Sequence, residues 1–241
     1  MELEQGLLQG KILLNLDTED DDEFSIGCAG GMDTNTKYSY QKTDVIAGSK
    51  TYKVVVNGLN GGHSGVQINE ELGNANKIMN RLMYNCEQYN LQIVEINGGS
   101  LRNAIPRESF ATITANADYL KEFNSRAALI KTEYLIQDNK LNITIEETNS
   151  VSEAITLTDT AKITTTIYAC HHGVFRMSRA IEGLVETSSS LARVIVKDGE
   201  FITQSLQRSS LESGKWDVAN TVAAPFRLMG CKVEQGGSYP G

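Results

Sequence analysis

A glycine-rich segment carries a histidine that could take part in catalysis. His63 lies in Gly61-Gly-His-Ser-Gly65, between a predicted strand and the start of a predicted helix. Such loops expose a side chain and leave backbone N–H groups free, and an imidazole there can donate a hydrogen bond to a developing oxyanion. The segment is neither a nucleophile elbow nor a P-loop, because Ser64 is followed directly by glycine and Gly-Lys-Ser/Thr is missing from it. The alternative is a glycine-rich turn with an exposed histidine.

Three further polar residues are candidates for binding. Asn103, in a loop predicted over 97–106, offers a donor pair and an acceptor to a ligand carbonyl or carboxylate. Arg208, where a predicted strand ends, suits bidentate binding of a carboxylate. Asp17 closes an apolar strand predicted over 12–16, and the carboxyl ends of strands in α/β sheets are where sites gather. The alternative to ligand binding is that Asn103 only stabilises its own turn and that Arg208 is an ordinary surface arginine at a strand end.

Two other clusters do not match metal-binding motifs. The acidic run 17–23 misses the EF-hand pattern, since counting from Asp17 puts Asp22 and Cys28 where glycine and glutamate are needed. Cys170-His171-His172 are chain neighbours, which rarely point at one metal. The four cysteines form no CxxC pair and are interpreted as reduced thiols of a cytosolic protein.

The elements that must position these residues begin with a β-α-β-β-α-β pattern. Strands are predicted over 51–57, 91–96, 110–115 and 141–146, and helices over 70–88 and 120–135. Asn69 is the expected N-cap of the first helix. The pattern predicts a split βαβ fold of α+β type, with an antiparallel sheet covered by helices on one face.

The rest of the chain predicts isolated elements. The Thr- and Ile-rich segment 153–170 fits a strand or a helix, and its length favours a helix. An Asp198-Gly199 turn joins the strands of a hairpin over 191–207. A late helix over 219–229 and a short strand over 232–235 follow, and no internal repeat is visible. Near the N-terminus, strands expected over 12–16 and 24–29 have almost nothing before them, which suggests that the chain begins partway through a domain.

Composition excludes some classes of function. The 241 residues carry a formal net charge of −8 and are 40% hydrophobic, typical of a soluble globular protein. An acidic chain disfavours nucleic acid and anionic membrane surfaces as partners. No apolar run is long enough to span a membrane.

Several motifs in one order resemble a known family. They are Leu14-Asn-Leu-Asp17, Gly27-Cys-Ala-Gly-Gly31, Gly58-Leu-Asn-Gly-Gly-His-Ser-Gly65, Leu72-Gly-Asn-Ala-Asn76, Gly98-Gly-Ser-Leu-Arg-Asn-Ala-Ile-Pro-Arg-Glu108, Gly183-Leu-Val-Glu-Thr-Ser188 and Ser205-Leu-Gln-Arg-Ser209. Together they resemble the aminoacyl-histidine dipeptidases, carnosine-cleaving enzymes of the two-zinc peptidase group. The likeness covers nearly the whole chain and is weakest over 118–180.

The resemblance implies a two-domain enzyme with two zinc ions, of which this chain is a part. Residues 1–33 would be a remnant of an α/β catalytic domain, and residues 34–241 the lid. Asp17 alone matches a zinc ligand of the family. His63 resembles the lid histidine that reaches the substrate carbonyl oxygen, Asn103 a substrate-contacting lid asparagine, and Arg208 the arginine that holds the substrate's C-terminal carboxylate.

The resemblance also implies partners and leaves one alternative open. We expect a dipeptide substrate of Xaa-His type such as carnosine, a homodimer formed through the lid, a cytoplasmic location, and an isolated chain that is inactive. The alternative is a non-catalytic module of ferredoxin-like architecture that binds a small ligand or dimerises.

Overall fold

The computed structural model describes residues 6, 9–12, 14 and 27–241. Asp17 and most of the two expected N-terminal strands therefore lie outside the described residues. Within those two segments, Ile12, Leu14 and residues 27–29 are described, and none of them is in a strand.

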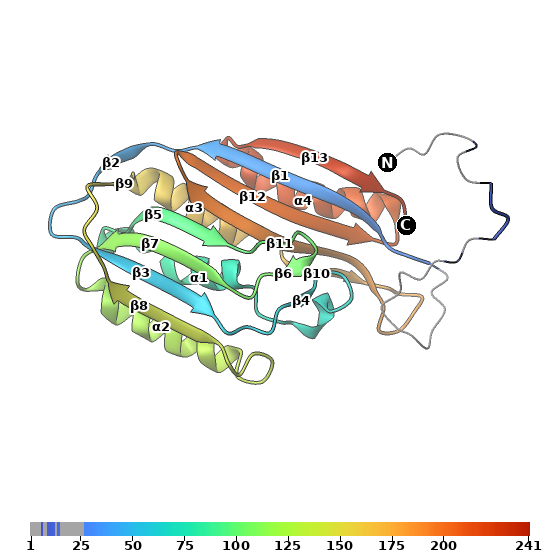
Figure 1. Ribbon diagram of the computed structural model, residues 1–241, viewed down its shortest axis with the longest axis horizontal. Helices are drawn as coiled ribbons and strands as arrows, with labels where there is room; N and C mark the ends of the chain where they lie inside the picture. The colour runs from blue at the N-terminus through green and yellow to red at the C-terminus, as the bar shows by residue number, and fades with distance from the viewer. Residues whose placement is uncertain (1–5, 7–8, 13, 15–26) are drawn as a thin grey trace.

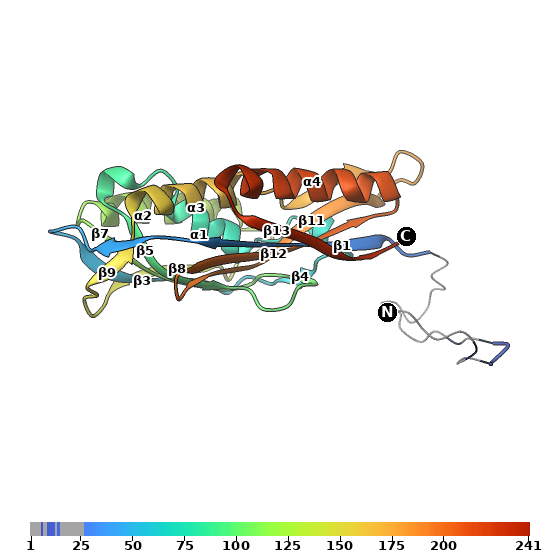
Figure 2. The same ribbon diagram turned by 90° about the horizontal axis from the view of Figure 1, so that it is seen from above.

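One antiparallel sheet and a layer of helices make up the described chain (Figures 1 and 2). The sheet has nine strands in the order β13-β1-β12-β11-β5-β7-β3-β8, with β10 beside β11. These strands are β1 (Gly30–Ser39), β3 (Lys50–Asn57), β5 (Gln92–Gly98), β7 (Ser109–Ala115), β8 (Asn142–Glu147), β10 (Gly173–Met177), β11 (Val185–Lys197), β12 (Glu200–Ser209) and β13 (Lys232–Tyr239). Two small ladders pair β2 (Lys42–Asp44) with β9 (Glu153–Ile155), and β4 (Gly62–His63) with β6 (Ala104–Ile105).

Four α-helices lie on the same face of the sheet, as Figure 2 shows. They are α1 (Ala75–Met83), α2 (Tyr119–Glu133), α3 (Leu157–Ala169) and α4 (Glu212–Met229). The predicted class, an antiparallel sheet with helices on one face, is confirmed. The other face of the sheet is covered only in part, by the loops that carry β4 and β6 (Figure 2).

The sheet divides into two units of the same topology. The first unit runs β3-α1-β5-β7-α2-β8 and has the strand order β8-β3-β7-β5. The second unit runs β1-α3-β11-β12-α4-β13 and has the strand order β13-β1-β12-β11. Both are β-α-β-β-α-β folds, and β5 pairs with β11 to join them into one sheet. The first strand of the second unit is separated from its other elements by the whole first unit.

The first unit follows the prediction except at both ends of its first helix, which was expected over 70–88. Helix α1 ends at Met83 because Tyr84 is extended, and a separate 3₁₀ turn follows over Glu87–Tyr89. The expected N-cap Asn69 instead lies in a 3₁₀ turn, Ile68–Glu70, which ends at Glu71 in a left-handed conformation with φ of 56°. A helix cannot continue through that conformation. Asn74 is the actual N-cap, and its side chain accepts hydrogen bonds from the backbone N–H groups of Asn76 and Lys77.

Strand β1 was not predicted, and its polar sequence explains why. Thr34 and Thr36 are buried between the sheet and the helices, where Thr34 Oγ1 donates to Gln207 Oε1 at 2.7 Å and Thr36 shares a 2.7 Å hydrogen bond with Thr203. These buried polar side chains form hydrogen bonds with each other across the strands. The sequence of β1 therefore lacks the alternation of apolar and polar residues that predicts a strand. The expected domain boundary between residues 33 and 34 lies inside this strand.

The predictions for the rest of the second unit are confirmed. The segment 153–170 contains α3, preceded by the short strand β9. The hairpin of β11 and β12 turns at Asp198 and Gly199, with φ of 51° and 82° as a two-residue turn requires. Helix α4 continues through Pro225, and β13 extends further than expected, to Tyr239.

Candidate functional site

Two loops of the first unit hold His63 and Asn103 beside each other. Their backbones pair as β4 and β6, with His63 opposite Ala104, and Ser64 N donates to the carbonyl oxygen of Asn103 at 2.8 Å. His63 N donates to Gln67 Oε1 at 2.9 Å, which fixes the start of the turn. The half-buried His63 and the exposed Asn103 are thus brought together from predicted loops 40 positions apart.

The orientation of the His63 ring is set by its own turn. Val66 N donates to His63 Nδ1 at 3.2 Å, so Nδ1 is an acceptor and the proton of the neutral ring is assigned to Nε2. The Nε2 atom lies 3.5 Å from Nη2 of Arg208. Both groups carry N–H donors, and two donors that face each other leave room for a shared acceptor oxygen.

Arg208 reaches this point from the second unit. It lies on β12, 145 positions from His63, and its Nη1 donates to the hydroxyl of Tyr239 at 3.3 Å. Its Nε is buried and has no hydrogen-bond partner among the described residues. The guanidinium stem packs closely over Gly65, because an added Cβ there would lie 3.0 Å from Cδ and Nε of Arg208. Glycine at this position allows the two side chains to meet.

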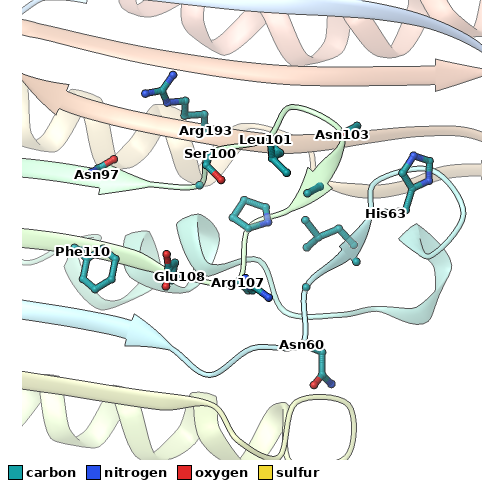
Figure 3. A pocket seen from close by; sticks show the side chains of 16 residues that line it. Asn60, His63, Asn97, Ser100, Leu101, Asn103, Arg107, Glu108, Phe110 and Arg193 are labelled. Atoms are coloured by element: carbon teal, nitrogen blue, oxygen red, sulfur yellow. The ribbon is translucent and has the colours of Figure 1, made fainter.

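A cavity of about 700 Å³ adjoins the His63 loop on the open face of the sheet. Figure 3 shows His63 and Asn103 at one end and Asn97 and Phe110 at the other. Arg193 of the second unit also lines it, as do Arg107 and Glu108 of the first unit. The cavity therefore has space and polar groups of both charges for a small zwitterionic molecule.

Arg102 ties the Asn103 loop to the second unit and was missed by the sequence reasoning. Its Nη1 donates to Asn35 Oδ1 at 2.9 Å and lies 3.1 Å from Asp33 Oδ2. Both partners are on β1. Arg102 directly precedes Asn103 in a motif that was recognised, but the sequence holds no signal for its partners.

The described residues do not form a metal centre. No group of three His, Cys, Asp or Glu side chains able to hold a metal ion occurs among them. Asp17, the expected zinc ligand, is outside the described residues. A zinc site needs three or four ligands, so the described part of the chain does not fit a zinc ion by itself.

Comparisons with known proteins show a family domain that matches part of the chain. Residues 46–135 match the peptidase dimerisation domain. The matched segment runs from just before β3 to just after α2, and so covers most of the first unit, including the His63 and Asn103 loops.

Two relatives extend the likeness to the whole chain. The cytosol non-specific dipeptidase of Escherichia coli strain K12 is 36% identical over 244 aligned residues, which cover 99% of this chain and 50% of that protein. The crystal structure of aminoacylhistidine dipeptidase from Vibrio alginolyticus matches with a TM-score of 0.88 and 36% identity, covering 99% of this chain and 50% of that one. The chain spans about half the length of both relatives. The resemblance to dipeptidases is thereby confirmed.

The names of the two relatives indicate different substrates. One is called non-specific and the other aminoacylhistidine, so dipeptide hydrolysis is the property they share.

Among the described residues, none of the helices is both long and apolar enough to cross a membrane.

Proposed function

We propose that this chain is the substrate-binding lid of a dipeptidase. The observation that supports this most directly is the 3.5 Å approach of His63 Nε2 and Arg208 Nη2, each of which presents a donor to the same point from a different unit. An acceptor-rich ligand would be held between them.

In this proposal the two residues serve adjacent groups of one substrate. Arg208 binds the C-terminal carboxylate, and His63 donates from Nε2 to the carbonyl oxygen of the peptide bond that is cleaved. In a dipeptide these groups belong to neighbouring residues, whose Cα atoms are only about 3.8 Å apart. A carboxylate clamp so close to an oxyanion donor therefore favours cleavage of the last peptide bond of the substrate, which in a dipeptide is the only one. Asn103 at the end of the cavity orients the substrate.

The remaining features are proposed for the whole protein. The two zinc ions would supply and activate the attacking water, and their ligands would come from outside the described residues, with Asp17 as the one candidate in this chain. The part of residues 1–33 that precedes β1 would belong to that catalytic part. We further propose a cytoplasmic enzyme that prefers Xaa-His dipeptides such as carnosine and forms a homodimer through the lid.

The test is His63→Ala in the full-length enzyme. Loss of one oxyanion donor is expected to lower kcat on the order of 10²–10³-fold. KM should change much less, because this hydrogen bond strengthens mainly in the transition state. The melting temperature should stay nearly the same, since the ring lies in a glycine loop outside the core. Unchanged turnover with unchanged melting temperature would mean that the segment is only a glycine-rich turn.

A further inference from the structure

We propose that Asp138 is the positioning residue for His63, through a carboxylate that clamps both ends of the loop on which His63 lies. Asp138 is in the turn between α2 and β8, far along the chain from that loop. Its effect on turnover rests on the function proposed above, whereas its effect on the position of His63 does not.

Both oxygens of the Asp138 carboxylate are engaged by the loop. Oδ1 accepts a hydrogen bond from Asn60 N at 2.7 Å, and Oδ2 accepts one from Gly73 N at 2.7 Å. The residue is 1% exposed, so both bonds are formed away from water. Hydrogen bonds from backbone N–H groups to a buried carboxylate are short and strong. Residues 60 and 73 thus become the fixed ends of the segment that contains His63.

The Asp138 turn is itself rigidly placed. Asp138 N donates to the carbonyl oxygen of Tyr134 at 2.8 Å, and the carbonyl oxygen of Asp138 accepts from Leu141 N at 2.9 Å. These bonds join the carboxylate to the end of α2 and the start of β8. The Asp138 carboxylate therefore fixes the loop relative to the core of the first unit.

Two glycines show how closely the loop and the turn approach. Gly58 has φ of 77°, and a Cβ added there would collide with the carbonyl oxygen of Lys140. A Cβ added to Gly73 would lie 2.5 Å from a methyl carbon of Leu59 and 3.1 Å from Asp138 Oδ2. Only glycine fits at position 58, and a side chain at position 73 would require Leu59 to move, so the base of the loop contacts the turn closely.

Beyond its base, the loop is held by the β4–β6 ladder, by the bond from Ser64 N to the Asn103 carbonyl oxygen, and by the bonds within the His63–Gln67 turn. Only Gly61 and Gly62 separate Asn60 from His63, and the ladder that holds the loop to the Asn103 segment pairs just two residues on each side. A displacement of Asn60 would therefore also displace His63 and its imidazole ring. Release of the clamp should therefore move the ring away from Arg208 without unfolding the unit.

The experiment compares Asp138→Asn with Asp159→Asn in the 241-residue chain. Asp159 is a matched control, since it is also a buried carboxylate and accepts from Gln41 N at 2.8 Å and from the Tyr38 hydroxyl at 2.9 Å, but lies on α3 in the second unit. Amide hydrogen exchange of Asn60 and Gly73 and the NMR signals of the His63 ring are measured. D138N is expected to speed exchange of both amides about tenfold or more and to shift the ring signals, and D159N to leave them unchanged.

Other results would overturn the inference. They are unchanged Asn60 exchange and His63 ring signals in D138N, or the same disturbance in D159N. If D138N does not fold, Asp138→Glu replaces it, because this variant keeps the charge on a longer side chain. D138E is expected to shift the NMR signals of the His63 ring, and unchanged signals in D138E would also overturn the inference.

Activity in the full-length enzyme separates this inference from the proposed function. D138N is expected to lower kcat about tenfold or more with a smaller change in KM. If D138N moves the ring but His63→Ala keeps full turnover, the positioning stands and the catalytic role of His63 fails.

Discussion

The contacts of the Arg208 side chain require a guanidinium group. Its guanidinium sends one nitrogen to the Tyr239 hydroxyl and a second towards His63, while its stem lies against Gly65. A planar group with several fixed donors can do this, and a single ammonium cannot. The site is therefore expected to distinguish arginine from lysine even though the charge is the same.

Arg208→Lys in the full-length enzyme tests this expectation. Loss of bidentate carboxylate binding should raise KM for a dipeptide about tenfold or more, with a smaller change in kcat, because the clamp already acts in the ground state. Stability should change by less than about 0.5 kcal/mol, since the side chain is outside the hydrophobic core. Steady-state kinetics and thermal melting measure the two effects. An unchanged KM would remove Arg208 from the carboxylate site.

At the scale of elements, Asn74 and His172 join α1 to the second unit. Asn74 caps α1 with its side-chain oxygen, and its Nδ2 donates to the carbonyl oxygen of Leu191 at 2.9 Å and lies 3.4 Å from His172 Nδ1. Burial lowers the pKa of His172 to about 3, and the nearby Lys77 and His171 add to this effect. A protonated ring could not accept the hydrogen bond from Asn74.

Acid should therefore weaken this junction. An unfolded chain takes up the His172 proton near the ordinary pKa of about 6.5, but the folded chain does not until about pH 3. The unfolded state binds more protons in between, so the free energy of unfolding should fall as pH drops through that window. Urea midpoints measured across it should fall less steeply in His172→Gln, which cannot titrate. An identical pH dependence in both proteins would contradict the assignment.

At the scale of the whole molecule, each of the two four-stranded units covers one edge strand of the other. The pairs Val194–Gly98, Ile195–Asn97 and Val196–Ile96 join β11 to β5, so neither strand is free to pair with another chain. The strands at the two ends of the sheet path, β8 and β13, carry charged residues, among them Glu146, Glu147 and Lys232, which disfavour edge pairing. These charges favour a homodimer that forms through a face of the lid.

We predict that the chain self-associates through such a face. The match to a peptidase dimerisation domain supports this, because that domain type is named for its role in assembly. Sedimentation equilibrium should give about twice the chain mass of 26.4 kDa. A mass that stays monomeric at high protein concentration would contradict the prediction.

The sequence by itself determined the local parts of this protein. Apolar spacing was sufficient for α2 and the strands of the first unit, segment length for α3, and the Asp198-Gly199 turn for the hairpin. Glycine-rich motifs pointed to the loops of His63 and Asn103. These signals are local, because helix periodicity, strand alternation and turn conformation depend on residues close in the chain.

Only the tertiary structure decided how the parts combine. Strand β1 has polar residues that are satisfied by β12, so its burial is invisible without that partner. The repeated topology arises although no repeat is visible in the sequence, because strand order depends on pairings between distant segments. His63 meets Arg208 across 145 positions, and Asp138 reaches Asn60 across 78. The first contact forms only when β5 pairs with β11 and joins the two units, and the second only when the first unit folds, so no spacing along the chain encodes them.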